Sequence, residues 1–260
     1  VGATTLVAMC GIVGYVGQAS DGTALDVVME GLARLEYRGY DSAGVAVIDG
    51  DHVAFRKRSG KLVNLQDAIA AEPLPQTATA IGHTRWATHG GPTDDNAHPH
   101  LGGSHGRLAL IHNGIIENFH ALKTELLEQG VAFASETDTE VAAHLVSAAY
   151  DRTHDLTAAM LEAVARLDGA FTLLAIHADQ PGVVVGARRN SPLVVGLGTG
   201  ANYLGSDVAA FIGHTRDAVE LGQDQIVELT RDGVTVTTFD GAPGIAYEEA
   251  VNFDTSGYQL

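Results

Sequence analysis

The chain has 260 residues, 45% of them hydrophobic, a formal net charge of -17 and a single cysteine. This length suits one large domain or two small ones, and the apolar content is enough for a sizeable core. The acidic balance argues against nucleic acid and an anionic membrane as partners. A single cysteine excludes an intrachain disulfide, which fits a reducing cytoplasm.

Residues 1–20 carry no charged side chain, which raises the question of a targeting signal. A signal peptide needs a basic segment, yet the first Lys or Arg is Arg34. A lipoprotein signal would also need a small residue before Cys10, where Met9 stands. Export is therefore not expected, and residues 1–9 are interpreted as an extension or a removed N-terminus. A misassigned start codon, vector sequence and a short propeptide all remain open.

Hydrophobic periodicity and turn signals place strands and helices along the chain. In chain order we expect strand 12–16, helix 23–36, loop 39–44, strands 45–48, 53–56, 80–82 and 108–111, helices 119–129, 138–150 and 157–167, and strands 171–177, 182–186, 193–195, 226–230 and 234–239. Asp49-Gly50 and Asp232-Gly233 are hairpin turn signals. Helices grouped between runs of strands predict an α+β fold with antiparallel sheets packed under helices. Residues 241–260 lose periodicity and are interpreted as a tail or a truncated interdomain linker.

Cys10 directly follows Met9, so removal of an initiator methionine would make it the N-terminal residue. A free α-amine has a pKa of about 8 and a free cysteine about 8.5, so near neutral pH the amine can accept the thiol proton. One residue would then supply both a nucleophile and its base. The alternative for a lone cysteine is a small buried hydrophobe.

Residues 83–90 read HTRWATHG and lead from a short apolar strand into a loop with Gly and Pro. Binding residues are commonly placed at such junctions. Arg85 can hold a carboxylate through two parallel hydrogen bonds, and Trp86 can wall a small pocket. Structural packing of the Arg-Trp pair is the alternative.

Two further segments carry candidate polar groups. Asn113 and Gly114 follow strand 108–111, and an Asn amide and a Gly N–H are suitable donors to an oxyanion. An ordinary Asn-Gly turn is the alternative. Asp138 opens a helical pattern, where the helix dipole would stabilise its carboxylate for contact with a ligand ammonium. Simple helix capping is the alternative there.

The 12 histidines raise the question of a metal site. His98, His100 and His105 lie close in sequence, downstream of Asp94 and Asp95. They have neither HExxH spacing nor a cysteine partner, so no metal is expected. The Gly-rich segment 196–200 lacks the spacing of a dinucleotide-binding loop and is interpreted as a turn.

Five motifs occur in order along the chain, namely 10–14 (CGIVG), 35–44 (LEYRGYDSAG), 83–90 (HTRWATHG), 112–118 (HNGIIEN) and 135–140 (SETDTE). Together they resemble the glutaminase domain of the glucosamine-6-phosphate synthases, a class II glutamine amidotransferase domain. The resemblance covers roughly residues 9–240, so residues 10–240 are expected to form the glutaminase domain. The amidophosphoribosyltransferases share the N-terminal cysteine but usually lack the YRGY and RWATH motifs.

The resemblance implies an N-terminal-nucleophile hydrolase fold, a four-layer αββα sandwich with two stacked antiparallel sheets. It also implies hydrolysis of L-glutamine to glutamate and ammonia through a cysteine thioester, without a cofactor. By resemblance, Cys10 is the nucleophile with its own α-amine as base. The side chain of Asn113 and the N–H of Gly114 form the oxyanion hole.

The resemblance also implies how glutamine is bound. Arg85 would hold the α-carboxylate and Asp138 the α-ammonium. The residues expected to line and close the pocket are Trp86, Thr88 and His89, with His98 as a further candidate.

The family continues into sugar-isomerase lobes that bind fructose 6-phosphate and receive the ammonia, and this sequence does not supply them. The chain is therefore expected to hydrolyse glutamine but not to make glucosamine 6-phosphate by itself. The full-length enzyme is expected to be cytoplasmic and homo-oligomeric. Two alternatives remain open. The glutaminase could serve an amidophosphoribosyltransferase, or the chain could be a non-catalytic glutamine-binding module if Cys10 is never exposed as the N-terminus.

Overall fold

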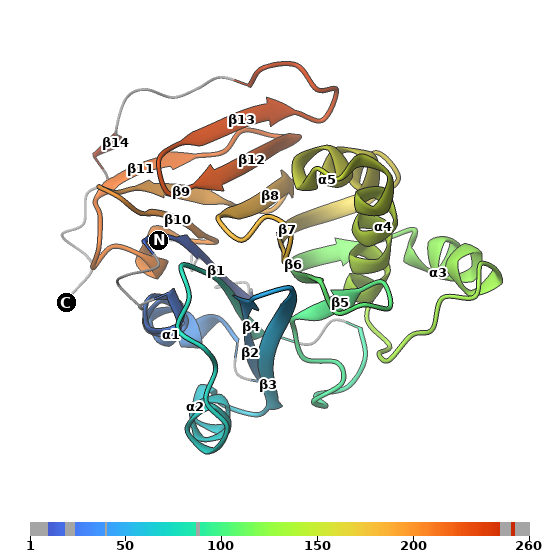
Figure 1. Cartoon of the computed structure of the whole chain (residues 1–260), viewed down its shortest axis with the longest axis horizontal. Helices are drawn as coiled ribbons and strands as arrows, with labels where there is room; N and C mark the ends of the chain where they lie inside the picture. The colour runs from blue at the N-terminus through green and yellow to red at the C-terminus, as the bar shows by residue number, and fades with distance from the viewer. Residues whose placement is uncertain (1–9, 19–23, 40, 87–88, 245–250, 253–260) are drawn as a thin grey trace, which may run out of the picture.

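Two antiparallel sheets lie face to face, with helices on their outer sides (Figure 1). The computed structural model describes residues 10–18, 24–39, 41–86, 89–244 and 251–252. The expected extension 1–9 lies outside the described residues, as does most of the tail 241–260.

The first sheet is 8-stranded, with the order β14-β11-β9-β10-β1-β4-β2-β3. Its strands are β1 (Gly11–Val16), β2 (Ser42–Asp49), β3 (His52–Ser59), β4 (Thr79–Arg85), β9 (Val194–Leu197), β10 (Asn202–Gly205), β11 (Asp217–Glu220) and β14 (Val251–Asn252). Strand β1 pairs with β10 on one side and β4 on the other, and all its residues are buried. The residue before β1 is Cys10, so the cysteine stands at the end of a fully buried strand.

The second sheet is 6-stranded, with the order β13-β12-β8-β7-β6-β5. Its strands are β5 (His100–Gly102), β6 (Leu108–Ile116), β7 (Gly169–His177), β8 (Val183–Arg189), β12 (Gln225–Thr230) and β13 (Val234–Thr238). Strand β6 pairs with β7 along its whole length, and Asn113 stands opposite Thr172.

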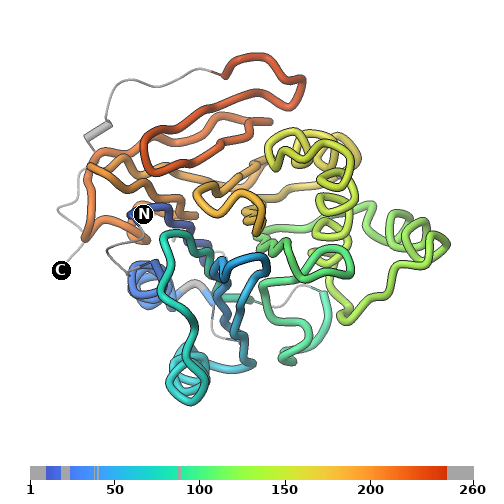
Figure 2. The backbone as a smooth tube through the Cα atoms, in the orientation of Figure 1, coloured from blue at the N-terminus to red at the C-terminus, as the bar shows by residue number. Residues whose placement is uncertain are grey.

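Two groups of helices cover the sheets. The helices are α1 (Ala24–Leu35), α2 (Leu62–Ala71), α3 (Phe119–Glu128), α4 (Asp138–Thr153) and α5 (Leu156–Val164), with the short 3₁₀ helices η2 (Glu36–Arg38) and η3 (Val208–Ala210). In Figures 1 and 2, α1 and α2 lie beside the first sheet, whereas α4 and α5 lie along the second.

Three hydrophobic clusters fill the spaces between these layers. One joins α1 to the first sheet and includes Val45 of β2. The second lies between the two sheets and includes Ile12 of β1 and Leu174 of β7. The third joins the second sheet to its helices and includes Leu173 of β7 and Val146 of α4. The neighbours Leu173 and Leu174 serve different clusters because successive strand side chains point to opposite faces. The expected four-layer sandwich is thus confirmed.

The structure also corrects several sequence predictions. The expected loop 39–44 is wrong in its second half, because β2 begins at Ser42. The strand expected to end at Ile111 continues through Asn113 and Gly114, so an Asn-Gly turn is excluded. Helix α2 was missed because its buried apolar face is small, with only Leu62 and Leu65 buried.

Several strands were not predicted from the sequence. These are β5, β10, β11 and β14, which are 3, 4, 4 and 2 residues long. Such short strands show too few side chains for an alternating pattern to stand out. The turn expected over 196–200 holds only in part, because β9 extends to Leu197.

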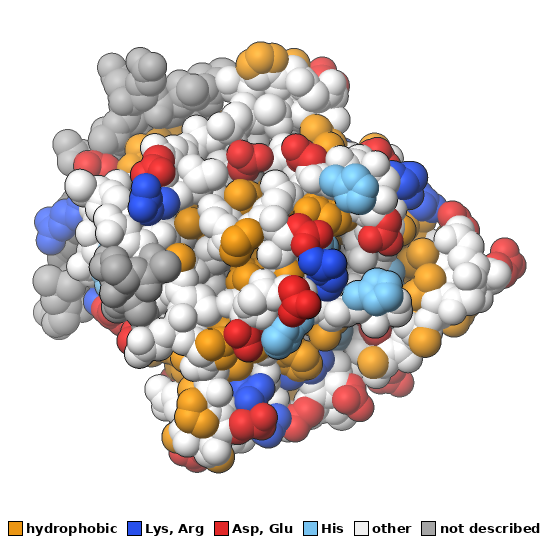
Figure 3. Space-filling model, viewed as in Figure 1, with side chains coloured by type: hydrophobic (Ala, Val, Ile, Leu, Met, Phe, Trp, Pro, Cys, Tyr) orange, Lys and Arg blue, Asp and Glu red, His pale blue; other side chains and the backbone are white. Residues whose placement is uncertain are grey.

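Charged side chains are interspersed on the surface rather than sorted by sign. On the face shown in Figure 3, acidic, basic and histidine side chains lie among one another. Within the described ranges, no helix combines the length and the apolar character needed to cross a membrane.

Candidate active site

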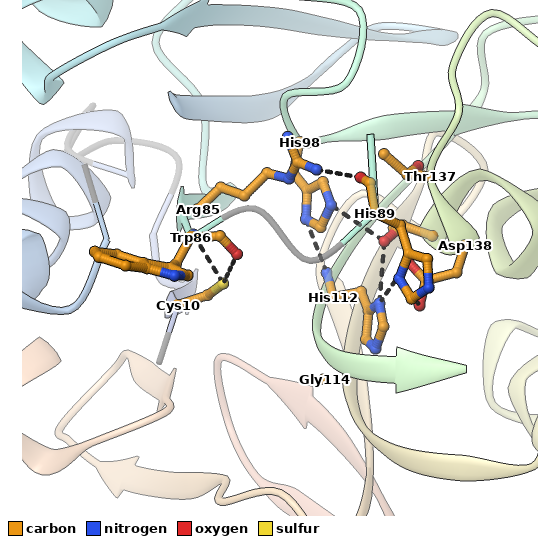
Figure 4. A pocket seen from close by; sticks show the side chains of 10 residues that line it. Cys10, Arg85, Trp86, His89, His98, His112, Gly114, Thr137 and Asp138 are labelled. Carbon is orange, nitrogen blue, oxygen red and sulfur yellow. Dashed lines mark hydrogen bonds and ion pairs between the residues drawn. The ribbon is translucent and has the colours of Figure 1, made fainter. Parts of the chain in front are cut away.

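A small pocket forms where β1, β4, β6 and the first turn of α4 converge (Figure 4). It is lined by Cys10, Arg85, Trp86, His89, His98, His112, Gly114, Thr137, Asp138 and Thr139. The cavity volume is about 10 Å³, roughly the room that one water needs. The fold thus brings together segments that lie more than a hundred positions apart in the sequence.

Cys10 is fixed beside the end of β4. The backbone N–H of Trp86 donates to Cys10 Sγ at 3.1 Å, and the thiol lies 3.5 Å from the Trp86 carbonyl oxygen. Behind it, the Ile12 N–H donates to Ser206 Oγ at 3.1 Å, and the Ser206 N–H to the Ile12 oxygen at 3.1 Å. These bonds tie the start of β1 in place and hold the sulfur at the pocket.

The thiol of Cys10 is not activated by its described neighbours. Burial, with a smaller contribution from the nearby carboxylate of Asp41, raises the pKa of the thiol to about 11. The Trp86 N–H and the charge of Arg85 act in the opposite direction but do not offset burial. Since the thiolate is the nucleophilic form, a nucleophilic role for Cys10 would require a proton acceptor for this thiol.

Asn113 and Gly114 stand next to Cys10 in the final part of β6. Asn113 Nδ2 donates to the Cys10 carbonyl oxygen at 2.8 Å, and Asn113 Oδ1 lies 2.9 Å from His83 Nε2. Gly114 has φ = 122°, and a Cβ there would lie 2.0 Å from the Ala170 carbonyl oxygen. Only glycine fits this position. The expected pair of oxyanion donors is therefore held by a strand, not by a turn.

Arg85 is buried at the end of β4 and points into the pocket (Figure 4). Its Nη1 donates to the Gly91 carbonyl oxygen at 3.2 Å, and its Nη2 donates to the carbonyl oxygens of Gly90, at 3.1 Å, and His89. A guanidinium has more N–H donors than these carbonyls use. The group is thus oriented by the loop and can still bind a carboxylate.

Asp138 is the first residue of α4 and is buried. Its Oδ2 accepts a hydrogen bond from the Ile116 N–H at 2.9 Å and lies 4.0 Å from His89 Nδ1, while its Oδ1 lies 3.8 Å from His112 Nδ1. The backbone dipole at a helix N-terminus favours a negative charge there. The pocket therefore holds a fixed anion on the side of α4 and a fixed cation at Arg85.

Three further residues, Trp86, Thr88 and His89, were predicted to line and close the pocket. Trp86 lines the pocket and is 40% exposed. His89 also lines the pocket, and its ring lies edge-on to Phe119 with the centroids 4.9 Å apart. Thr88 lies outside the described residues.

His98 lies in the pocket wall, within a network of buried polar groups that the sequence prediction missed. The His112 N–H donates to His98 Nδ1 at 3.3 Å. The Thr139 hydroxyl lies 3.1 Å from His98 Nε2 and 3.0 Å from His112 Nδ1. Burial lowers the pKa values of both imidazoles. The sequence signal for His112 was a polar residue directly after four apolar strand residues.

Two of the three histidines near Asp94 and Asp95, His98 and His100, make hydrogen bonds to threonine hydroxyls. His100 Nε2 lies 3.0 Å from the hydroxyl of Thr137, and His98 bonds to Thr139. Among the residues that the structure describes, no group of three or more His, Cys, Asp or Glu side chains is arranged to hold a metal ion.

Comparison with known proteins identifies the family that this chain matches. The family model of the glutamine amidotransferase domain matches residues 83–213. The glutamine–fructose-6-phosphate aminotransferase (isomerizing) of Streptomyces coelicolor is 65% identical over 248 residues, which are 95% of this chain and 40% of that protein. The protein of the same name from Corynebacterium efficiens is 59% identical over 253 residues, with 95% and 40% covered. The chain thus spans about 40% of the length of these relatives.

Solved structures agree in fold. The glutamine phosphoribosylpyrophosphate amidotransferase of B. subtilis has a TM-score of 0.74 and 27% identity, covering 88% of this chain and 49% of that one. A structure described as the allosteric regulatory enzyme of purine biosynthesis has a TM-score of 0.75 and 29% identity, with the same coverage. The fold is that of an N-terminal-nucleophile amidotransferase. The chain belongs to the glutamine amidotransferase domain family and is a glutamine amidotransferase enzyme domain.

Proposed function

We propose that the chain hydrolyses L-glutamine to glutamate and ammonia with Cys10 as the nucleophile, as the glutaminase part of a glutamine–fructose-6-phosphate aminotransferase. One observation carries this proposal. The Asn113 amide bonds to the Cys10 backbone in the same pocket that Arg85 and Asp138 line with opposite charges. The site thereby combines a nucleophile, an oxyanion donor and two charged groups that suit the carboxylate and the ammonium of an amino acid.

Recognition of glutamine rests on the two charged side chains. We assign the α-carboxylate to Arg85 and the α-ammonium to Asp138, with Trp86, His89 and Thr88 closing the pocket and His98 in its wall. Charge-assisted hydrogen bonds in a water-poor site are stronger than neutral ones. The cavity of about 10 Å³ is too small for an amino acid, so its lining must move apart when glutamine enters.

Activation of the thiol requires that Cys10 be the N-terminal residue. Burial raises the thiol pKa to about 11, and a free α-amine with a pKa of about 8 would supply the missing proton acceptor. The amine takes the thiol proton as sulfur attacks the side-chain amide carbon of glutamine. Retention of residues 1–9 would turn this amine into a peptide N–H, which cannot accept a proton.

The tetrahedral intermediate carries its negative charge on the former amide oxygen. We assign its stabilisation to Asn113 Nδ2 and the N–H of Gly114. An Asn amide nitrogen has two hydrogens, so the bond to the Cys10 oxygen leaves one for the oxyanion. The α-ammonium group of Cys10, formed when its amine took the thiol proton, returns this proton to the departing nitrogen, and ammonia leaves. Water then adds to the γ-glutamyl thioester, which releases glutamate and the thiol.

The names of the relatives support the acceptor that we propose for the ammonia. At 65% and 59% identity they are aminotransferases named for fructose 6-phosphate, whereas the phosphoribosylpyrophosphate amidotransferase is 27% identical. We infer that a sugar-isomerase domain receives the ammonia in a full-length, homo-oligomeric cytoplasmic enzyme. The chain by itself should not form glucosamine 6-phosphate.

The test measures glutamate release from glutamine by protein expressed from Met9, with intact mass confirming Cys10 as the N-terminal residue. The matched proteins are the same chain with Cys10→Ala, and the 260-residue chain with Met9→Ala, which cannot begin at Met9. Release by the first protein alone is expected. No release by a protein with N-terminal Cys10, combined with thermal stabilisation by glutamine, would favour a binding module instead.

A further inference from the structure

His83 contacts the proposed oxyanion donor although it does not line the pocket. It lies in β4, is completely buried, and pairs across the sheet with Ile12 and Gly44. Its Nε2 is 2.9 Å from Asn113 Oδ1. The contact joins the two sheets directly behind the proposed reaction centre, since β4 belongs to the first sheet and β6 to the second.

The hydrogen bonds determine where the proton on His83 lies. Asn113 approaches the Cys10 carbonyl oxygen at 2.8 Å, and a carbonyl oxygen only accepts, so the Asn113 atom facing it is Nδ2. Asn113 Oδ1 therefore faces His83 and must receive a hydrogen from it. Burial lowers the pKa of His83 to about 3, so the ring is neutral at physiological pH. Its one N–H is consequently at Nε2.

A second imidazole holds this ring from behind. His98 stacks on His83 with the centroids 4.1 Å apart. The His112 N–H donates to His98 Nδ1, so His98 carries its hydrogen on Nε2 and donates to Thr139 Oγ1. The Thr139 hydroxyl then donates to His112 Nδ1. This closed set of bonds links β6 to the first turn of α4, where Asp138 lies.

The orientation of the Asn113 amide decides whether the site can work. An amide is nearly the same shape after a 180° rotation, but rotation would exchange an N–H donor for an oxygen. The rotated group would then repel both the Cys10 carbonyl oxygen and a developing oxyanion. With its hydrogen on Nε2, His83 stabilises the productive orientation, which the Cys10 carbonyl oxygen also favours.

We propose that His83 is a positioning residue for glutamine hydrolysis, whose Nε2–H holds Asn113 Oδ1 so that Asn113 Nδ2 faces the reacting carbon. This inference rests on the proposed glutaminase function. Among the described residues no contact joins His83 to the thiol, so His83 acts on the reaction through Asn113. The residue should therefore affect kcat and leave the KM for glutamine nearly unchanged.

The experiment uses protein with N-terminal Cys10 and two substitutions of similar size. His83→Phe keeps a flat ring against His98 but has no donor, whereas His83→Gln keeps an amide N–H near the position of Nε2. We expect His83→Phe to lower kcat about 10–100-fold, less than loss of an oxyanion donor itself, with KM within about threefold. His83→Gln should stay within about fivefold of the wild-type kcat.

A second measurement separates positioning from a general structural role. Alkylation of Cys10 by iodoacetamide forms a carbon–sulfur bond, expels iodide and builds no oxyanion. Its rate should be the same in the wild type and in His83→Phe. Equal losses of alkylation and turnover in His83→Phe, or an unchanged kcat, would overturn the proposal.

Two controls keep the result decisive. If His83→Phe does not fold, His83→Asn replaces it, because its shorter amide reaches the position of Nδ1 and not Nε2. Equal kcat values for His83→Asn and His83→Gln would then overturn the proposal. An inactive wild type with N-terminal Cys10 would refute the proposed glutaminase function instead, so the two failures are distinguishable.

Discussion

The two walls of the pocket differ in charge, because one is neutral and the other carries charged side chains. We group Cys10 and Gly114, which line the pocket, with Asn113, which bonds to the Cys10 carbonyl oxygen, as the reaction wall. Strand pairing and the neutral imidazoles behind it hold this wall in place. The recognition wall comprises Arg85 and Asp138, both charged and both buried. Neutral, oriented donors suit a charge that appears only during reaction. Fixed charges suit the permanent charges of an amino acid. In the proposed chemistry, the groups that determine kcat therefore lie on one wall, and the groups that determine the KM for glutamine lie on the other.

Substitution at the reaction wall should give the largest effect. Asn113→Ala removes one proposed oxyanion donor and should lower kcat for glutamate release by about 10²–10³-fold, with little change in KM. Asn64→Ala is the matched control, because Asn64 lies on α2 and bonds to the Ser59 carbonyl oxygen. A comparable loss in both variants, or a KM effect without a kcat effect, would contradict the division between the walls.

Substitution at the recognition wall should act mainly on KM. Asp138→Asn keeps an acceptor for the Ile116 N–H but loses the charge proposed to bind the α-ammonium. A hydrogen bond to a charged group is worth about 1.5–3 kcal/mol, so KM for glutamine should rise about 10–100-fold. Steady-state kinetics over a wide glutamine range measures this. The neighbouring carboxylate in Glu136→Gln serves as the control, and it should leave KM unchanged.

The neutral imidazoles behind the reaction wall should make folding sensitive to acid. Burial lowers the pKa of His83 to about 3, while the unfolded chain titrates near 6.5. Below pH 6.5 the unfolded state binds more protons, so stability is full above this pH and falls as the pH drops toward 3. His83 alone should account for about 2 kcal/mol between pH 7 and pH 5.

Urea unfolding measured from pH 7 down to pH 5 tests this dependence. His83→Gln should flatten it, whereas substitution of the exposed His105 by Gln should not. An identical slope in wild type and His83→Gln would show that His83 is not neutral in the folded state. The pKa of Glu140 is lowered to about 2, so its contribution to folding stability is lost only below about pH 4.5. It therefore does not affect the measurement between pH 7 and pH 5.

The smallest effect concerns the packing of His89. Its ring lies edge-on to Phe119 at 4.9 Å, and such contacts are worth about 0.5–1.5 kcal/mol. Phe119→Leu should raise KM for glutamine about two- to fivefold and leave kcat nearly unchanged. Phe133→Leu is a close control, because Phe133 makes a similar contact with His144 at 5.0 Å. Equal KM changes in both variants would show that the packing of His89 on Phe119 does not contribute to glutamine binding.

Much of the fold was predictable because its long elements carry regular patterns. The one-sided stripe of α1 and the Asp49-Gly50 turn between β2 and β3 were recognised, and the structure contains both. The short strands β10 and β11 were not recognised, because four residues form no clear period. The strand character of Asn113 and Gly114 was also missed, since the local Asn-Gly signal favours a turn while pairing with β7 decides otherwise.

The sequence by itself determined the residue types of the site and their family. The order of its motifs resembles that of a known family, and this resemblance indicated Cys10, Arg85, Asn113 and Asp138, whose side-chain chemistry suits the roles that we propose for them. Only the tertiary structure decided the neutral state of His83 and the direction of its hydrogen bond. Burial between two sheets sets the first, and the carbonyl of Cys10 sets the second through Asn113. Both depend on strands that meet in space, which no local pattern encodes.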